Sequence, residues 1–288
     1  MNRRMFLAMA ALPAAVRAED WPAKSGVFRQ DNLVAWCIVP FDAKQRGPEE
    51  RAAMLERLGI KRFAYDWRDK DIPTFDQEID ALNKHGIRLQ AFWFPCGLEP
   101  AKDKNAGIIL DLLERRKLKT ELWFSLSGET KELDAMPLEK RVAEVAESVQ
   151  WVAGRAGKIG CSVALYNHGG WFGEPENQVA ILKRVRMKNV GIVYNFHHGH
   201  DHIERFPELF ALMEPHLMAV NLNGMRKGGP MILPIGDGDR ELEMIKVIRR
   251  SRYRGPIGIL GHREELDAEE ALRLNLEGLK KLIPITGS

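Results

Sequence analysis

The sequence predicts an α/β protein built as a single (β/α)8 barrel. From residue 33 onward, short apolar segments alternate with longer amphipathic segments, and this alternation repeats eight times. Most of the short segments are apolar throughout, which is typical of parallel strands buried on both faces. Each unit spans about 27 to 40 residues, the size of one strand with its following helix. Eight such units that end in a helix close naturally into a barrel.

The individual elements follow from these segments. We expect the strands at residues 33–39, 61–66, 88–94, 120–126, 160–166, 190–196, 217–222 and 256–261. Helical patterns lie between them at residues 48–58, 75–85, 138–156, 176–185, 241–250 and 268–282. Pro48 suits a first helical turn, and Gly59 and Gly86 suit left-handed caps. An open doubly wound sheet is the main alternative, but it would place a Gly-rich turn where residues 40–43 read Pro-Phe-Asp-Ala.

The N-terminal segment is predicted to lie outside the barrel. Residues 1–18 have the features of an export signal, with two arginines before an apolar stretch and a small-residue cleavage site at residues 16–18. The paired arginines resemble a twin-arginine signal, and an ordinary secretory signal is the alternative. The apolar stretch of about 12 residues is too short to span a membrane, which needs about 20. We therefore expect residues 19–288 to form a periplasmic or secreted barrel domain without membrane contact.

Charge and cysteine content exclude several classes of protein. The chain holds 43 basic and 40 acidic residues, and residues 1–18 contribute three arginines and no acid, so the remaining domain is formally neutral. It has no basic block, which argues against a nucleic-acid partner. Cys37, Cys96 and Cys161 are few, widely spaced and close to apolar segments, so buried free thiols are expected. Their spacing does not indicate a structural zinc site.

The candidate site lies at the ends of the predicted strands, where barrels of this kind carry their chemistry. Seven of the eight histidines fall in the second half of the chain, and five of these follow a strand directly. A single such histidine is more often structural, but this convergence with asparagines favours function. The candidate catalytic residues are His168, His198 and His262. The candidate substrate-binding residues are Asp66, Trp93, Tyr166, Asn167, Trp171, Asn195, Asn221 and Asn223.

These side chains suit a neutral ligand with many hydroxyl groups. Asparagine and histidine both donate and accept hydrogen bonds, and Trp171 offers a flat apolar face to a sugar ring. A phosphate would favour a Gly-rich helix start or a cationic cluster, and residues 226–229 are more typical of a solvated loop. Asp66 is the best carboxylate candidate because it ends the second strand. Glu129, after the fourth strand, is either a further site residue or an exposed acid at a helix start.

Two local segments resemble the xylose isomerase-like TIM barrels, a family that includes sugar epimerases, inosose dehydratases and endonuclease IV-type enzymes. Residues 165–170 read Leu-Tyr-Asn-His-Gly-Gly and are similar to the family's Leu-Glu-Asn-His-Gly-Gly turn. Residues 195–198 read Asn-Phe-His-His and are similar to its Asp-x-x-His. The resemblance implies a divalent metal held after strands five to eight, with two glutamates moving protons. The corresponding positions here hold Tyr166, Asn195, Asn221, and Gly261 or His262.

The chain departs from the family at these four positions, because none of them is a carboxylate. Hard divalent cations prefer anionic oxygen ligands, so we expect the inherited metal site to be absent and predict no cofactor. Binding of a divalent metal remains an alternative only at a shifted site formed by His168, His198 and His262. Such a site would suit a softer ion such as zinc.

The sequence therefore favours an exported carbohydrate-active barrel whose partner is a small-molecule carbohydrate. The expected activity is that of a sugar isomerase, epimerase or lyase that abstracts a proton next to a carbonyl. Its proton-transfer groups would be the three candidate histidines, with Tyr166 or Asp66 as partners. The alternative is a catalytically silent carbohydrate-binding barrel, as the missing carboxylates indicate. A glycoside hydrolase is disfavoured because no clear carboxylate pair ends the strands. The oligomeric state stays open.

Overall fold

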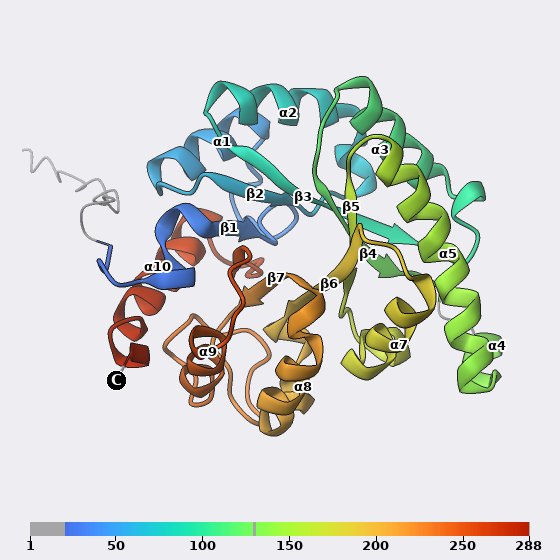
Figure 1. Ribbon diagram of the computed structural model, residues 1–288. Helices are drawn as coiled ribbons and strands as arrows, with labels where there is room; N and C mark the ends of the chain where they lie inside the picture. The colour runs from blue at the N-terminus through green and yellow to red at the C-terminus, as the bar shows by residue number, and fades with distance from the viewer. Residues whose placement is uncertain (1–20, 129–130, 288) are drawn as a thin grey trace, which may run out of the picture.

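Eight parallel strands form a closed barrel in the order β1 to β8, and β8 pairs with β1. The computed structural model describes residues 21–128 and 131–287. Within this part of the chain the helices surround the strands, as a view close to the barrel axis shows (Figure 1). The predicted (β/α)8 barrel is confirmed. The predicted export signal and Glu129 lie outside the described residues.

All eight predicted strands are present. They are β1 (Leu33–Trp36), β2 (Arg62–Tyr65), β3 (Arg88–Cys96), β4 (Glu121–Leu126), β5 (Ser162–Tyr166), β6 (Val190–Asn195), β7 (Leu217–Leu222) and β8 (Ile257–Leu260). Their backbone groups bond to neighbours on both sides, and their side chains are buried on both faces, which explains the continuous apolar segments.

The six predicted helices are also confirmed. The helices are α1 (Pro48–Arg57), α2 (Phe75–Lys84), α3 (Lys104–Arg115), α4 (Lys131–Ala135), α5 (Leu138–Lys158), α6 (Gly170–Gly173), α7 (Pro175–Val185), α8 (Phe206–Met213), α9 (Glu241–Arg250) and α10 (Ala268–Leu282). The amphipathic helices α3 and α8 were not among the predicted segments. No described helix has the length and apolar character needed to cross a membrane.

The first strand ends earlier than predicted, and its end shapes the site. Cys37 has a positive φ of 56°, so the backbone turns out of the sheet directly after Trp36. The next two backbone N–H groups, of Ile38 and Val39, donate to Asp66 Oδ1 at 3.3 and 3.2 Å. A carboxylate at the end of β2 therefore takes over hydrogen bonds that a longer β1 would have made to a neighbouring strand.

The interior of the barrel is filled by aromatic rings over a layer of small residues. Alanines on β2, β3, β5 and β7 face the axis: Ala64, Ala91, Ala164 and Ala219. This leaves room for Trp36 and Trp123, whose rings meet edge to face with centroids 4.7 Å apart. Because this packing closes the middle of the barrel, polar chemistry is confined to the strand ends. The three cysteines are buried and free, as predicted.

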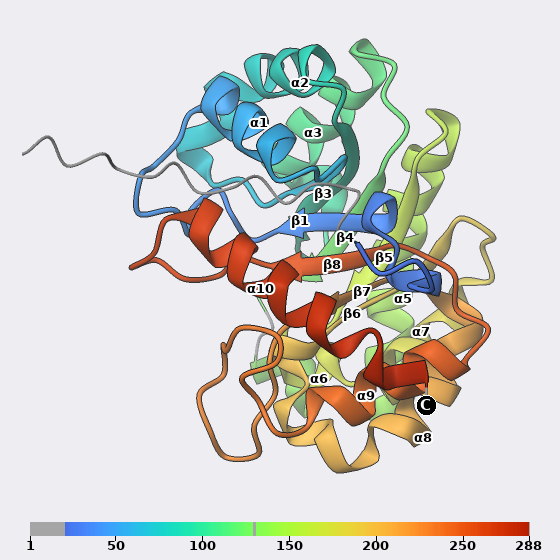
Figure 2. The same ribbon diagram turned by 90° about the vertical axis from the view of Figure 1, so that its left-hand side faces the viewer.

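A long loop, residues 223–240, connects β7 to α9 (Figure 2). Its two stems are held by Glu241, a buried carboxylate at the start of α9. This carboxylate accepts backbone hydrogen bonds from Met225 at 3.0 Å and from Gly236 and Gly238 at 2.9 Å. Within the same loop, Ile232 packs against the interior core of the barrel. The loop thus reaches the C-terminal mouth of the barrel while its stems remain fixed to a helix.

Candidate functional site

Four buried polar side chains end the barrel interior at its C-terminal mouth. Asp66 directly follows β2, and the other three lie on β5, β6 and β7: Tyr166, Asn195 and Asn221. All four are at most 3% exposed. Each follows an inward-facing apolar residue by two positions, so the alternation of a strand turns it toward the axis. We call this set the floor. It brings together four of the residues that the sequence predicted for the site.

The Tyr166 hydroxyl is the centre of a hydrogen-bonded group in the floor. It accepts hydrogen bonds from Trp36 Nε1 at 3.3 Å and from Asn195 Nδ2 at 2.5 Å. Burial raises the pKa of Tyr166 well above its usual value, so the phenol stays neutral. Asn195 Oδ1 accepts in turn from the backbone N–H of His197 at 3.1 Å. Tyr166 therefore orders the end of β6 through Asn195.

Asn167 fastens the ends of two neighbouring strands. Its Nδ2 donates to the backbone carbonyl of Asn195 at 3.1 Å, and its Oδ1 accepts from the backbone N–H of Asn195 at 2.7 Å. Both polar groups of the side chain are thus bonded to the backbone, and the residue is buried. Asn167 lies at the predicted place but joins β5 to β6 instead of presenting its amide to the mouth.

Asp66 combines deep burial with an incomplete set of hydrogen bonds. Its Oδ1 accepts two backbone N–H groups, while its Oδ2 has no partner among the described residues. Burial raises the pKa of Asp66 to about 7, against the opposing effect of the nearby positive charge of Arg68. The Asp66 carboxyl therefore exchanges its proton near neutral pH.

Other polar atoms at the mouth also lack a partner within the described ranges. Both amide atoms of Asn221 are unpaired, as are Asn223 Oδ1 and Trp93 Nε1. Asn221 also requires Gly258 on β8, because a Cβ there would lie 1.9 Å from Asn221 Oδ1. Asn223 Nδ2 donates to the carbonyl of Met231 in the 223–240 loop at 3.3 Å. Unpaired buried polar groups are costly, so this end of the barrel has hydrogen-bonding capacity that a polar ligand would meet.

Four imidazoles form a row above the floor. His168 follows β5, His197 and His198 follow β6, and His262 follows β8. Adjacent ring centroids are 4.7 Å apart for His168 and His198, 4.3 Å for His198 and His197, and 5.1 Å for His197 and His262. We call these four residues the histidine row. The structure thus brings the three candidate catalytic histidines together, with His197 between two of them.

All four imidazoles are held neutral at pH 7. Burial and the neighbouring imidazoles lower the pKa of His198 to about 2 and that of His262 to about 4. Loss of water and the charge of Arg68 lower the pKa of His168, and burial lowers that of His197. His168 is nevertheless solvent-exposed at the rim, whereas His198 and His262 are half-buried. The row therefore offers neutral rings that accept or donate one hydrogen bond at each nitrogen.

Arg68 and Phe41 complete the site, and the sequence did not point to either. The Arg68 guanidinium carbon lies 4.8 Å from the Trp93 ring centroid and 5.6 Å from that of Phe41. Trp93 contacts His168 at 5.4 Å between centroids, and Phe41 contacts His262 at 3.5 Å. Arg68 comes two residues after Asp66, but an arginine in a loop is usually solvated, so only the fold reveals its position.

Trp171 is placed apart from this set. It lies on the short helix α6, and the guanidinium carbon of Arg141 from α5 is 5.2 Å from its ring centroid. Its carbonyl accepts a hydrogen bond from Asn177 Nδ2 at 2.8 Å. Within the described part of the chain, its ring makes no contact with the histidine row. Its proposed role as a sugar platform therefore receives no support from the ring geometry.

The donor set at strands five to eight does not fit a hard divalent cation. The Tyr166 hydroxyl is neutral and already accepts two hydrogen bonds, and the Asn195 amide is bonded on both sides. Asn221 supplies only a neutral amide, and Gly261 supplies no side chain. Hard cations are bound by anionic oxygens, which these positions lack. Among residues 21–128 and 131–287, no three His, Cys, Asp or Glu side chains are grouped to hold a metal ion.

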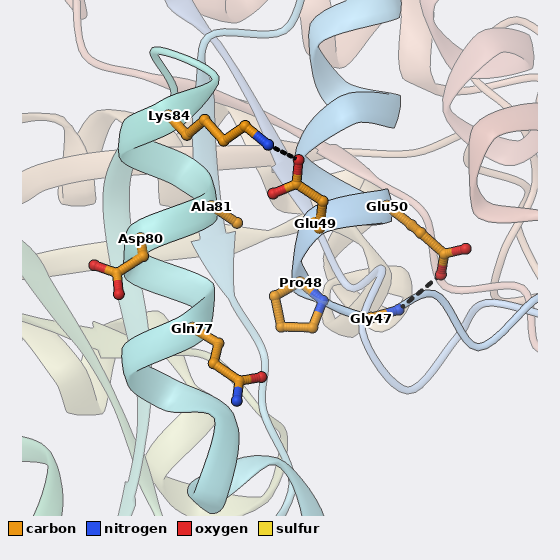
Figure 3. A pocket seen from close by; sticks show the side chains of 8 residues that line it. All are labelled: Gly47, Pro48, Glu49, Glu50, Gln77, Asp80, Ala81 and Lys84. Carbon is orange, nitrogen blue, oxygen red and sulfur yellow. Dashed lines mark hydrogen bonds and ion pairs between the residues drawn. The ribbon is translucent and has the colours of Figure 1, made fainter.

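A separate groove lies on the outer surface, between α1 and α2 (Figure 3). Its charged groups pair locally: Lys84 binds Glu49, and the Glu50 carboxylate accepts from the backbone N–H of Gly47 at 3.3 Å. These contacts connect two helices and cap the first of them. The groove therefore shows a structural role and no convergence of polar groups like that at the mouth.

Comparison with known proteins agrees with the barrel geometry. The profile of the xylose isomerase-like TIM barrels matches residues 52–282. The chain belongs to this family. No curated protein is similar enough in sequence to match it.

Solved structures of this family's fold resemble the chain over most of its length. The IOLI protein with a bound zinc atom has a TM-score of 0.66 at 15% identity, covering 88% of this chain and 98% of that one. The 3-keto-D-glucoside 4-epimerase YcjR of E. coli has a TM-score of 0.65 at 14% identity, covering 86% and 98%. The probable 3-DHS dehydratase AsbF of Bacillus anthracis has a TM-score of 0.64 at 12% identity, with the same coverages. At these identities the similarity establishes the shared fold.

Proposed function

We propose that this xylose isomerase-like barrel is a carbohydrate-modifying enzyme, a sugar isomerase, epimerase or lyase that removes a proton next to a carbonyl group. The observation that carries the proposal is the row of four neutral imidazoles above a buried polar floor. Neutral imidazoles accept and donate protons without a metal ion, which suits a site whose donors do not fit a hard cation. A 3-keto-glucoside epimerase and a probable dehydratase share the fold and support this class of chemistry.

His168 is the proposed general base. Its ring is exposed at the rim, is neutral at pH 7 and makes no hydrogen bond within the described residues. His198 is a poorer base because its pKa is lowered to about 2. A ring that stays neutral is instead a good N–H donor to the oxygen that gains charge as the proton leaves. His262, with a pKa of about 4, is assigned the same donor role.

The ring positions also restrict how a substrate binds. The His168 and His198 rings contact each other at 4.7 Å, so no substrate carbon fits between their faces. The sugar therefore lies against the edges of the row, with the reacting C–H toward His168. In this arrangement the edge of the His168 ring accepts the proton, while the edge of the adjacent His198 ring donates a hydrogen bond to the carbonyl oxygen.

The test is exchange of solvent deuterium into a sugar C–H, followed by NMR over a panel of free sugars and oxidised glycosides. Replacing His168 by Gln should lower exchange by about 10² to 10⁴-fold with a smaller effect on binding. His198→Gln should reduce the rate less, because Gln keeps a donor. His216→Gln is the matched control, since His216 precedes β7 at the opposite end of the barrel.

Two outcomes would reject this assignment. Exchange that persists after loss of both His168 and His198 would place the base elsewhere in the mouth. Tight sugar binding without exchange for any sugar would support the alternative, a carbohydrate-binding barrel without catalysis.

We also propose that residues 1–18 direct export, so that the barrel acts in the periplasm or outside the cell. The support is the sequence pattern alone. If the twin-arginine route is used, changing Arg3 and Arg4 to Lys should leave the precursor in the cytoplasm. Unchanged export of this variant would indicate an ordinary secretory signal.

A further inference from the structure

Arg68 is a cation at the mouth whose guanidinium has no carboxylate partner among the described residues. Its Nη1 donates to the backbone carbonyls of Asp66 and Trp67, both at 2.8 Å. Its Nε and Nη2 make no hydrogen bond, and its guanidinium forms no ion pair, with any residue in the described ranges. The side chain is half-buried. The guanidinium is therefore held in place from one side while two of its nitrogens keep free N–H groups.

The contacts of Arg68 turn the histidine row into a closed ring around the mouth. The guanidinium lies against Trp93 on one side and Phe41 on the other. These two aromatic rings contact the two ends of the histidine row. Followed once around, the ring of contacts is Arg68, Trp93, His168, His198, His197, His262, Phe41 and back to Arg68. The positive charge also lowers the pKa of both His168 and His262, so it acts on the row from both ends.

Among the described residues, the charge of Arg68 is only partly balanced, by the Asp66 carboxyl. The four imidazoles are neutral, and the only carboxyl group of the floor, Asp66, is buried with a pKa near 7. Arg263 offers a contrast on the same face of the barrel, because it forms an ion pair with Glu265 at 2.5 Å. Within the described part of the chain, the mouth therefore carries an excess of positive charge at pH 7, which a negative group on a ligand would neutralise.

We propose that the substrate is a sugar acid whose carboxylate binds the Arg68 guanidinium. The inference rests on the proposed function and names its substrate class. A planar guanidinium with two free donor groups matches the two oxygens of a carboxylate. A phosphate would draw further cations or a helix N-terminus, and Arg68 is the one cation in the ring of contacts. The neutral sugar expected from the sequence thus gains one acidic group.

Matched ligand pairs test this directly. Titration calorimetry would compare methyl β-D-glucuronide with methyl β-D-glucoside, methyl α-D-galacturonide with methyl α-D-galactoside, and D-gluconate with D-glucitol. At least one acid should bind 10-fold or more tightly than its neutral counterpart. The difference should shrink as salt is added, because screening weakens an exposed charge pair.

Variants then assign the preference to one side chain. Arg68→Gln should weaken binding of the preferred acid by about 10- to 100-fold, since hydrogen bonds to charged groups are the stronger class. It should weaken binding of the neutral counterpart by a smaller factor, so that the preference for the acid shrinks. Arg68→Lys keeps the charge but loses the planar fork, so it should retain part of the preference. Arg263→Gln, which removes a cation already paired with Glu265, should leave the preference intact.

The outcomes separate this inference from the proposed function. The role of Arg68 would be overturned if the unmodified protein bound acids and neutral sugars equally well. It would also be overturned if Arg68→Gln kept the full preference for the acid. Deuterium exchange into a neutral sugar under those conditions would leave the proposed chemistry standing. Failure of every acid and every neutral sugar to bind would reject both proposals. Melting curves of each variant establish that a lost preference is not lost folding.

Discussion

Replacing Asp66 by Asn should remove a decline in stability that the protein shows between about pH 4 and pH 7. The pKa of Asp66 is raised from 3.8 to about 7, chiefly by burial. The native state therefore binds more protons than the unfolded state across this window. Stability is then greatest below the unfolded pKa and falls as the pH rises to the folded pKa.

The size of the effect follows from the shift. About three pKa units at 1.36 kcal/mol each correspond to ~4 kcal/mol of lost stability above pH 7. The Asn side chain keeps the oxygen that accepts from Ile38 and Val39, and its amide nitrogen takes the position of the unpaired Oδ2. This new unpaired donor costs about 1 to 3 kcal/mol at every pH. We therefore expect a net stabilisation of ~1 to 3 kcal/mol at pH 8 and a net loss below pH 4.

The measurement is urea unfolding of both proteins at pH values from 4 to 8.5. The difference between the two curves isolates Asp66, because burial also raises the pKa of Glu121 to about 7 and both proteins retain that residue. Asp42→Asn is a control of opposite sign. Burial acts against ionisation of Asp42, but hydrogen bonds from Ala268 and Arg46 outweigh it and lower its pKa. That variant should lose stability at neutral pH. A difference for Asp66→Asn that does not change with pH would refute the reasoning.

Three further predictions concern packing and metal. Tyr166→Phe leaves Asn195 Nδ2 without its acceptor and should cost about 1 to 3 kcal/mol in urea unfolding; a change under ~0.5 kcal/mol would show that the hydroxyl is dispensable. Gly278→Ala places a Cβ 1.6 Å from the Ile235 carbonyl oxygen and should lower the free energy of unfolding by about 1 to 3 kcal/mol. Gly154→Ala on α5 is the control, because its Cβ meets no atom within 4 Å and the melting temperature should not fall. Chelator treatment should leave the melting temperature unchanged, and a fall that one added cation restores would contradict the donor argument.

The barrel could be predicted from the sequence because its strands are buried on both faces and are therefore apolar throughout. Eight continuous apolar segments predicted parallel strands, and the lack of a Gly-rich turn at residues 40–43 favoured the barrel over an open doubly wound sheet. The end of β1 was not readable, since Cys37 takes a left-handed conformation that is usual for glycine and uncommon for cysteine. Helix α8 was not predicted; it is only 8 residues long and follows a 3-10 helix at His200–Arg205.

The site was predictable by position but not by contact. Strand ends in a barrel carry polar chemistry, so the closeness of the three candidate histidines was predictable from their positions, while their catalytic role stays a prediction. Whether an amide faces the mouth or a neighbouring backbone depends on side-chain directions. The Asn167 amide bonds to the backbone of Asn195 instead of facing the mouth. Arg68 was not predicted for the same reason: only its contacts with Trp93 on β3 and Phe41 after β1 place it at the site.

The 223–240 loop has anchored stems, and its tip contributes a backbone carbonyl and an apolar side chain to the mouth of the barrel. Glu241 holds Met225, Gly236 and Gly238, while Asn275 of α10 accepts from the backbone N–H of Ile235 at 2.9 Å. The tip between these anchors reaches the mouth. The Met231 carbonyl of this tip lies 2.8 Å from His200 Nε2 and 3.4 Å from His197 Nδ1, so a change in the tip's backbone would reach the histidine row while the strand pairing stays as it is.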